Sequence, residues 1–141
     1  MKVKDIMTKD PAVCTPDTML QVVALMMVDH DCGQIPVIES NSNARPVGVV
    51  TDRDIIVRAV ARGMNPLDMT ARDVMTSPAV TVTPDTKVED CADTLADKRV
   101  RRVPVVDDDG ACSGMISQAD LAQHAPEKLT SKVLRTVSEP I

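Results

Sequence analysis

The chain has 141 residues, the length of one compact domain or of two very small ones that share a core. It contains no Phe, Tyr or Trp, which excludes a stacking platform for single-stranded nucleic acid and an aromatic cage. The net charge of −5 gives no global support for binding duplex nucleic acid or an anionic membrane. No apolar run reaches the length of a membrane span and no signal peptide is apparent, so we expect a cytoplasmic protein with reduced cysteines.

The sequence aligns with itself, because four short segments occur twice in the same order. We therefore place a first repeat at residues 1–63, a linker at 64–70, a second repeat at 71–126 and a C-terminal tail at 127–141. The matched segments are Asp5-Ile6-Met7-Thr8 with Asp73-Val74-Met75-Thr76, Thr15-Pro16-Asp17-Thr18 with Thr83-Pro84-Asp85-Thr86, Ile35-Pro36-Val37-Ile38 with Val103-Pro104-Val105-Val106, and residues 48–54 with 114–120.

Each repeat opens with a short helix, predicted at residues 3–7 and 71–75, and continues into an extended segment at 12–14 or 79–82. A longer helix follows. We predict that it begins at a capping box, in which a threonine is followed three residues later by Gln or Glu. These boxes are Thr18 with Gln21 and Thr86 with Glu89. In the first of these helices one buried face is predicted from the spacing of Met19, Val22, Val23, Met26 and Met27.

Two β-branched runs then predict a hairpin, at residues 35–38 and 47–50 in the first repeat and at 103–106 and 114–116 in the second. A second helix is predicted at 54–62, with Gly63 as its stop. Each repeat therefore has the order β-α-β-β-α, and the fold class is α+β. One repeat alone would bury too little apolar surface to be stable, so we expect the two to pack through their sheets with pseudo-twofold symmetry.

The sharpest motif is Gly-x-x-Thr/Ser-x-x-Asp, once per repeat at a strand-to-helix junction. In the first repeat Gly48 would let a ligand approach the strand backbone. Thr51 offers a hydroxyl beside the free N–H groups of the helix start, and Asp54 can accept both hydroxyls of a ribose. The same pattern also describes a helix N-cap without any ligand, and the motif alone does not decide between the two. The second repeat has Gly114, Ser117 and Asp120 at these places.

A basic cluster precedes the second hairpin in this acidic chain. Its members Arg101 and Arg102 could counter a phosphate, and the alternative is a solvated charged rim. The first repeat has Gly33-Gln34 there, so the two binding clefts would not be equivalent. The remaining members of the cluster are Lys98 and Arg99.

Catalysis has little support in the sequence. No Ser or Cys nucleophile has a His at a recognisable spacing, and His30 and His124 lie in different repeats. We therefore expect that the chain is not an enzyme. We also expect no metal site, because the cysteines form no ligand pairs. A thiol switch through Cys14 and Cys32 is a third possibility, which depends on their exposure and pKa.

The repeated segments resemble the cystathionine-β-synthase (CBS) domain family, here as a CBS pair or Bateman module. More narrowly, residues 48–55, 59–63 and 100–104 resemble small stand-alone CBS-pair proteins of the bacterial hypoxic-response type. The resemblance implies a non-catalytic sensor that binds AMP, ADP, ATP or S-adenosylmethionine, requires no cofactor and passes its signal to an unidentified protein partner. It also implies a homodimer formed through helices. The alternative is a structural or partner-binding homodimer with empty clefts.

In this family each cleft combines the Thr/Ser-x-x-Asp motif of one repeat with the first strand of the other. Threonine or serine would hold phosphate, aspartate would hold ribose, and Val13 or Val80 would line an aliphatic slot for adenine. The first cleft would then comprise Thr51, Asp54, Thr76, Ala79, Val80, Arg101 and Arg102. The second would comprise Ser117, Asp120, Thr8, Val13, Cys14 and Gly33.

Overall fold

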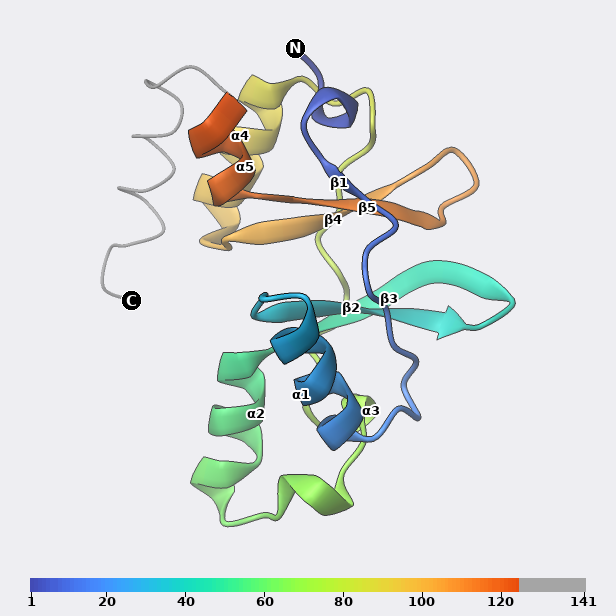
Figure 1. Cartoon of the computed structure of the whole chain (residues 1–141), viewed down its shortest axis with the longest axis vertical. Coiled ribbons are helices and arrows are strands. Elements are labelled where there is room, and N and C mark those ends of the chain that lie inside the picture. The colour runs from blue at the N-terminus through green and yellow to red at the C-terminus, as the bar shows by residue number, and fades with distance from the viewer. Residues whose placement is uncertain (125–141) are drawn as a thin grey trace. The chain divides into compact units, whose positions relative to one another are not determined.

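The structure is a computed structural model and describes residues 1–124, so the predicted tail lies outside the described residues. Helices and antiparallel strands alternate along the chain, as expected for the α+β class (Figure 1). The chain forms two compact units. Unit 1 contains Met1–Pro11, Thr81–Asp109 and the described residues from Ser113 onward, and unit 2 contains Ala12–Val80 and Gly110–Cys112.

Unit 2 is built on an antiparallel hairpin in which Gln34 pairs with Thr51 and Val37 with Gly48. Its helices lie on one side of this hairpin (Figure 1). The core between them contains Leu20, Val23, Ile35, Val37, Val50, Ala71 and Val74, all of them buried. The elements in chain order are α1 (Leu20–Asp29), β2 (Gln34–Ser40), β3 (Asn43–Thr51), α2 (Asp52–Arg58), η2 (Val60–Arg62), η3 (Pro66–Asp68) and α3 (Ala71–Val74).

Unit 1 repeats this plan with a three-stranded sheet in the order β1-β5-β4, in which Thr8 pairs with Met115. Helices α4 and α5 contact each other, and their buried side chains include Leu95 and Leu121. The elements are η1 (Val3–Asp5), β1 (Thr8–Lys9), α4 (Val88–Lys98), β4 (Arg102–Val106), β5 (Cys112–Ser117) and α5 (Gln118–His124). Both predicted hairpins are therefore present.

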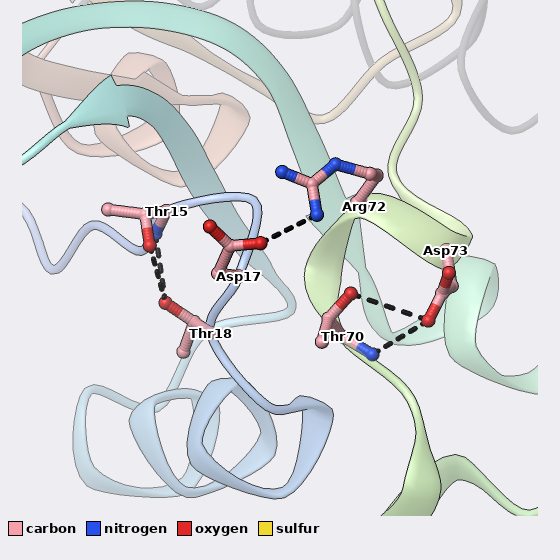
Figure 2. A network of polar contacts seen from close by, with 6 residues as sticks. All are labelled: Thr15, Asp17, Thr18, Thr70, Arg72 and Asp73. Carbon is pink, nitrogen blue, oxygen red and sulfur yellow. Dashed lines mark hydrogen bonds and ion pairs between the residues drawn. The ribbon is translucent and has the colours of Figure 1, made fainter.

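Unit 2 takes its short helix α3 from the second repeat, and this helix is held against the Thr-Pro-Asp-Thr turn of the first repeat (Figure 2). The N–H of Ala71 donates to the Thr18 carbonyl at 2.8 Å, and the N–H of Arg72 donates to the Pro16 carbonyl at 3.0 Å. The guanidinium of Arg72 also reaches the Asp17 carboxylate at 2.6 Å. We call residues 71–76 the leading segment of the second repeat. This segment thus completes unit 2, which holds most of the first repeat.

Unit 1 shows the reciprocal arrangement, because its η1 helix comes from the first repeat and its turn from the second. Here the N–H of Val3 donates to the carbonyl of Thr86, and the N–H of Lys4 donates to the carbonyl of Pro84, both at 2.9 Å. The ammonium of Lys4 lies 3.1 Å from the Asp85 carboxylate. The hydrogen bond from the Lys4 ammonium, together with the charges of Lys4 and Lys2, holds the pKa of the exposed Asp85 carboxyl below its usual value.

The predicted capping box at Thr18 is wrong. Helix α1 begins at Leu20, and the Thr18 hydroxyl instead accepts the N–H of Thr15 at 3.0 Å, which closes the turn. The Leu20 N–H needs no side-chain cap, because it donates to the backbone carbonyl of Met69 at 2.9 Å. The predicted capping box at Thr86 is wrong for the same reason. The Thr86 hydroxyl accepts the N–H of Thr83, and helix α4 begins at Val88.

The predicted second helix begins two residues early, at Asp52, and ends at Arg58. One 3-10 turn follows and stops at Gly63, whose φ of 74° is left-handed, so the predicted stop is confirmed. The extended segments make single bridges, from Cys14 to Val37 and from Val82 to Val105, rather than regular strands.

Helix α1 departs from its predicted single buried face. Val23 is fully buried and Met26 and Met27 are half-buried, but Met19 and Val22 are exposed. The reason is that α1 is apolar around most of its circumference, so that spacing alone does not select the face that packs. None of the helices in residues 1–124 is long and apolar enough to cross a bilayer.

Candidate functional site

The motif of the first repeat lies where β3 turns into α2, with Thr51 as the N-cap residue. The Thr51 hydroxyl accepts the N–H of Asp54, and one carboxylate oxygen of Asp54, Oδ2, accepts the N–H of Thr51, each at 3.0 Å. These two bonds form a capping box. The interpretation of the motif as a helix cap is therefore confirmed.

Thr76 comes to the same place from the second repeat. Its hydroxyl donates to Oδ1 of Asp54 at 3.1 Å. Its backbone forms a two-way antiparallel bridge with Val49 on β3, with N···O distances of 2.8 and 2.9 Å. The structure thus brings together three of the predicted site residues, Thr51, Asp54 and Thr76, within unit 2.

Gly48 leaves the space that the bridge between Val49 and Thr76 needs. A Cβ at position 48 would lie 2.7 Å from the Thr76 carbonyl oxygen, closer than real Cβ atoms approach. The sequence-based expectation that this glycine makes room for a ligand is wrong, because the room is filled by the backbone of the leading segment. Gly114 plays the same part in unit 1, where a Cβ would lie 2.8 Å from the Thr8 carbonyl oxygen.

The Asp54 carboxylate keeps hydrogen-bonding capacity after these contacts. Each of its oxygens accepts one bond from a described residue, Oδ2 from the Thr51 N–H and Oδ1 from the Thr76 hydroxyl. A carboxylate has about four acceptor positions, so about two remain. The side chain is half-buried.

Unit 1 contains the corresponding arrangement around Asp120. The N–H of Ser117 donates to Asp120 Oδ2 at 2.9 Å, and the N–H of Asp120 donates to the Ser117 hydroxyl at 3.2 Å. Thr8 lies next to this motif on the β1 strand, paired with Met115 of β5. Ser117, Asp120 and Thr8 therefore belong to one unit.

The other predicted site residues divide between the units. In unit 2, Ala79, Val80 and Val13 are half-buried, and Cys14 is buried in the core with its N–H bonded to Pro36. The carbonyl of Gly33 accepts the N–H of Asp52 at 3.0 Å, and in unit 1 the carbonyl of Arg101 accepts the N–H of Gln118 at 2.8 Å. The Arg101 side chain is exposed, and Arg102 is half-buried at the start of β4.

The two buried cysteines, Cys14 and Cys91, provide little thiolate. Burial raises the pKa of Cys14 to about 12. Burial, assisted by the negative charge of Asp120, raises the pKa of Cys91 to about 11. A thiol switch through Cys14 is therefore disfavoured, because the thiolate is the reactive form. Within residues 1–124 no three side chains of His, Cys, Asp or Glu gather as metal ligands would.

A family model for the CBS domain matches the chain twice, at residues 3–60 and 71–127. The chain belongs to the CBS domain family. Two curated relatives align over most of it. Uncharacterized protein MK0525 of Methanopyrus kandleri is 31% identical over 126 residues, which is 89% of this chain and 63% of that protein, so the chain spans less than two thirds of this relative. Hypoxic response protein 1 of Mycobacterium tuberculosis is 27% identical over 138 residues, which is 98% of this chain and 94% of that protein.

Solved CBS pairs share the fold of this chain. The CBS-domain pair of protein MJ0100, crystallised with 5′-methylthioadenosine and S-adenosyl-L-methionine, matches with a TM-score of 0.76 and 25% identity over 87% of this chain and 94% of that one. CBSX2, crystallised in complex with AMP, matches with a TM-score of 0.75 and 28% identity over 88% of this chain and 95% of that one. The expected CBS-pair fold is confirmed by this likeness and by the family match.

Sequence reasoning overlooked one residue beside the site of this CBS pair. Nη1 of Arg58, on α2, donates to the carbonyls of Val74 and Met75, directly before Thr76. Comparison of the two repeats gives no signal for this role, because the residue at the matching place in the second repeat is His124. The only hint in the sequence is that Asp54 and Arg58 stand four positions apart, and so share one face of a helix.

Proposed function

We propose that this CBS pair is a non-catalytic regulatory module that binds an adenosyl ligand, either an adenine nucleotide or S-adenosylmethionine. CBS pairs are generally regulatory, and the family match supports that class for this chain. The ligands named for the MJ0100 pair and for CBSX2 share an adenosine group. Adenosine is therefore the part of the ligand that we assign to this chain.

The observation that carries the proposal is the meeting of Asp54 with Thr76. Two residues from different repeats are joined through a half-buried carboxylate that retains acceptor capacity. Vicinal ribose hydroxyls are donors of the right number and spacing for the remaining acceptor positions. In this proposal Asp54 binds the ribose, and Thr51 and Thr76 hold the ligand beside it.

The remaining assignments come from the sequence and stay predictions. Arg101 and Arg102 would counter a phosphate, and Val80 would line the adenine slot. A second ligand would engage Asp120, supported by Ser117, Thr8, Val13, Cys14 and Gly33. A protein partner that receives the signal and a location in the cytoplasm are predictions of the same kind.

The second candidate function is a structural or partner-binding homodimer without ligand. It is favoured by the capping boxes, since the bonds of Asp54 and Asp120 to their own helix starts give both motifs a structural role. These caps account for the acids without a nucleotide. They do not account for the hydroxyl of Thr76, which adds nothing to the cap itself.

We also propose that the chain forms a homodimer through the helices of unit 2. Within residues 1–124, all the exposed large apolar side chains except Met1 belong to this unit. An apolar surface of this kind on a water-exposed helix layer is typical of an association site. The outer face of α4 in unit 1 instead carries exposed acids, Glu89, Asp90 and Asp97, which would repel a second copy. The helical surface of unit 2 comprises Met19, Val22, Leu25, Val28, Ile56, Val57, Val60, Met64 and Leu67.

A binding experiment tests the ligand proposal. Without Trp, Tyr or Phe, the protein absorbs little at 280 nm, so a 260 nm band in the purified protein would reveal a retained nucleotide. After removal of any such ligand, we would titrate adenosine, AMP, ATP and S-adenosylmethionine by calorimetry. Wild-type protein should bind at least one of them. A flat ultraviolet spectrum together with no heat from any of the four compounds would leave only the ligand-free homodimer.

Matched variants separate ribose binding from helix capping. Asp54→Asn keeps an acceptor for the Thr51 N–H but loses the charge, and should weaken adenosine binding about ten- to hundredfold. Asp73→Asn is the control, because Asp73 caps α3 through a 2.9 Å bond from the N–H of Thr70 and has no part in the proposed site (Figure 2). Equal affinity of wild type and Asp54→Asn would contradict the ribose assignment.

A further inference from the structure

Arg58 links helix α2 to the segment that carries Thr76. Nη1 of its half-buried side chain donates to the carbonyl of Met75 at 2.7 Å and to that of Val74 at 3.1 Å. Helix α3 ends at Val74, and the last carbonyls of a helix lack partners within the helix. A guanidinium is well suited to them, since they form the negative end of the helix dipole. Arg58 therefore satisfies the end of α3 from a different helix.

The same face of α2 contacts this segment a second time. Asp54 lies one turn before Arg58, and its Oδ1 accepts the hydroxyl of Thr76. On the other side, the backbone of Thr76 is bridged to Val49. Thr76 is thus fixed from β3, from Asp54 and, through the preceding peptide groups, from Arg58.

We infer that Arg58 is a positioning residue for the proposed ribose site, an inference that rests on the proposed function. By holding Val74 and Met75, it keeps the Thr76 hydroxyl against Oδ1 while the Thr51 N–H holds Oδ2. A carboxylate fixed at both oxygens cannot rotate freely, so its remaining acceptor positions are already oriented before the ligand arrives. Such preorganisation raises affinity because binding then costs less ordering.

The second repeat offers a built-in contrast. The residue at the place of Arg58, one turn after Asp120, is His124. An imidazole has at most two N–H groups on a shorter side chain, against the five N–H donors of a guanidinium. The acid of unit 1 therefore lacks an equivalent arginine, and loss of Arg58 should affect the unit 2 site alone.

The test measures AMP binding by calorimetry in an Asp120→Asn background, which leaves the unit 2 acid in place. Arg58→Ala should weaken AMP binding about tenfold, and Arg58→Lys, which keeps a charged N–H donor on a long side chain, should recover part of the loss. Arg72→Ala is the control. Arg72 is also an arginine next to this segment, but its guanidinium pairs with Asp17 at the surface, so its removal should leave AMP affinity unchanged.

A double-mutant cycle separates positioning from general stability. Thr76→Val should also weaken AMP binding, and adding Arg58→Ala to it should cause little further loss, because both changes remove the same orientation of Asp54. Additive losses, or an Arg58→Ala protein with wild-type AMP affinity, would overturn the inference.

Hydrogen exchange provides a readout that needs no ligand. The N–H of Thr76 donates to the Val49 carbonyl at 2.8 Å, and its exchange should become faster in Arg58→Ala but not in Arg72→Ala. Unchanged exchange in Arg58→Ala would show that Arg58 does not hold the segment. If wild-type protein binds none of the adenosyl compounds, the proposed function fails, and this measurement still decides whether Arg58 positions Thr76.

Discussion

The guanidinium of Arg72 and the carboxylate of Asp17 meet at 2.6 Å, although the two residues belong to different repeats. Lys4 and Asp85 form the reciprocal pair in unit 1 at 3.1 Å. These pairs mark the place where each unit receives the leading segment of the other repeat. The exchange matters for the candidate site because the same segment, a few residues later, brings Thr76 to Asp54. Neither repeat alone contains this arrangement.

The exchanged helix should depend on burial far more than on its ion pair. Both partners of the Arg72–Asp17 pair are exposed, and such pairs contribute about 0–1 kcal/mol. Val74, on the same helix, is completely buried in the core of unit 2. We expect Val74→Ala to lower the free energy of unfolding by about 2 kcal/mol, and Arg72→Ala by less than about 1 kcal/mol. Urea denaturation of the two variants measures both values, and a larger loss for Arg72→Ala would contradict this view.

Gly48 should tolerate no side chain. A methyl group at this position would collide with the Thr76 carbonyl oxygen at 2.7 Å, and neither backbone can move without breaking the bridge. We expect Gly48→Ala to destabilise the protein by about 1–3 kcal/mol in urea denaturation. In Gly33→Ala the contact at 2.9 Å is with the flexible Asp52 carboxylate, so this control should cost about 0.5 kcal/mol or less. Similar losses in both variants would argue against the backbone contact.

Much of the fold follows from the sequence because its signals are local. The hairpin between residues 34 and 51 has two β-branched runs on either side of a polar turn, and Gly63 supplies the left-handed stop that ends η2. The helix start at Thr18 fails for a reason that is not local. The carbonyl of Met69, far along the chain, instead accepts the N–H of Leu20, so the helix begins at Leu20 without a threonine cap.

In the candidate site, the contact between Thr51 and Asp54 follows from a local motif, whereas the contact with Thr76 does not. Thr51 and Asp54 share one motif, and their reciprocal bonds follow from spacing. The approach of Thr76 depends on the exchange of leading segments, which no local pattern encodes; only the resemblance to the CBS family placed Thr76 with Thr51 and Asp54. Arg58 donates to backbone carbonyls. Because every residue has a carbonyl, the residue types at these positions do not reveal that an arginine binds them.

The buried thiols should resist alkylation. With a pKa of about 12, Cys14 in the folded protein holds its proton at pH 8.5, and Cys91, at about 11, behaves similarly. Both values lie above the ordinary value of 9.0, so the stability they contribute is present below pH 9 and is lost as pH rises toward these values. Mass spectrometry after iodoacetamide treatment at pH 8.5 should show Cys14 and Cys91 unmodified in native protein and modified in urea. Rapid native labelling of Cys14 would revive the thiol switch.

The proposed dimer can be tested by placing one charge on the helical surface of unit 2. Leu25 lies on α1 with 54% of its surface exposed, so a lysine there should fold normally in the monomer. In an isologous interface the substitution places the new charge on both sides, where it would be desolvated and repelled. We expect wild-type protein to sediment as a dimer and Leu25→Lys as a monomer. Asp97→Lys, the matched change on the exposed acidic face of α4, should sediment as wild type does. A dimer that survives Leu25→Lys, or dissociates in Asp97→Lys, would place the interface elsewhere.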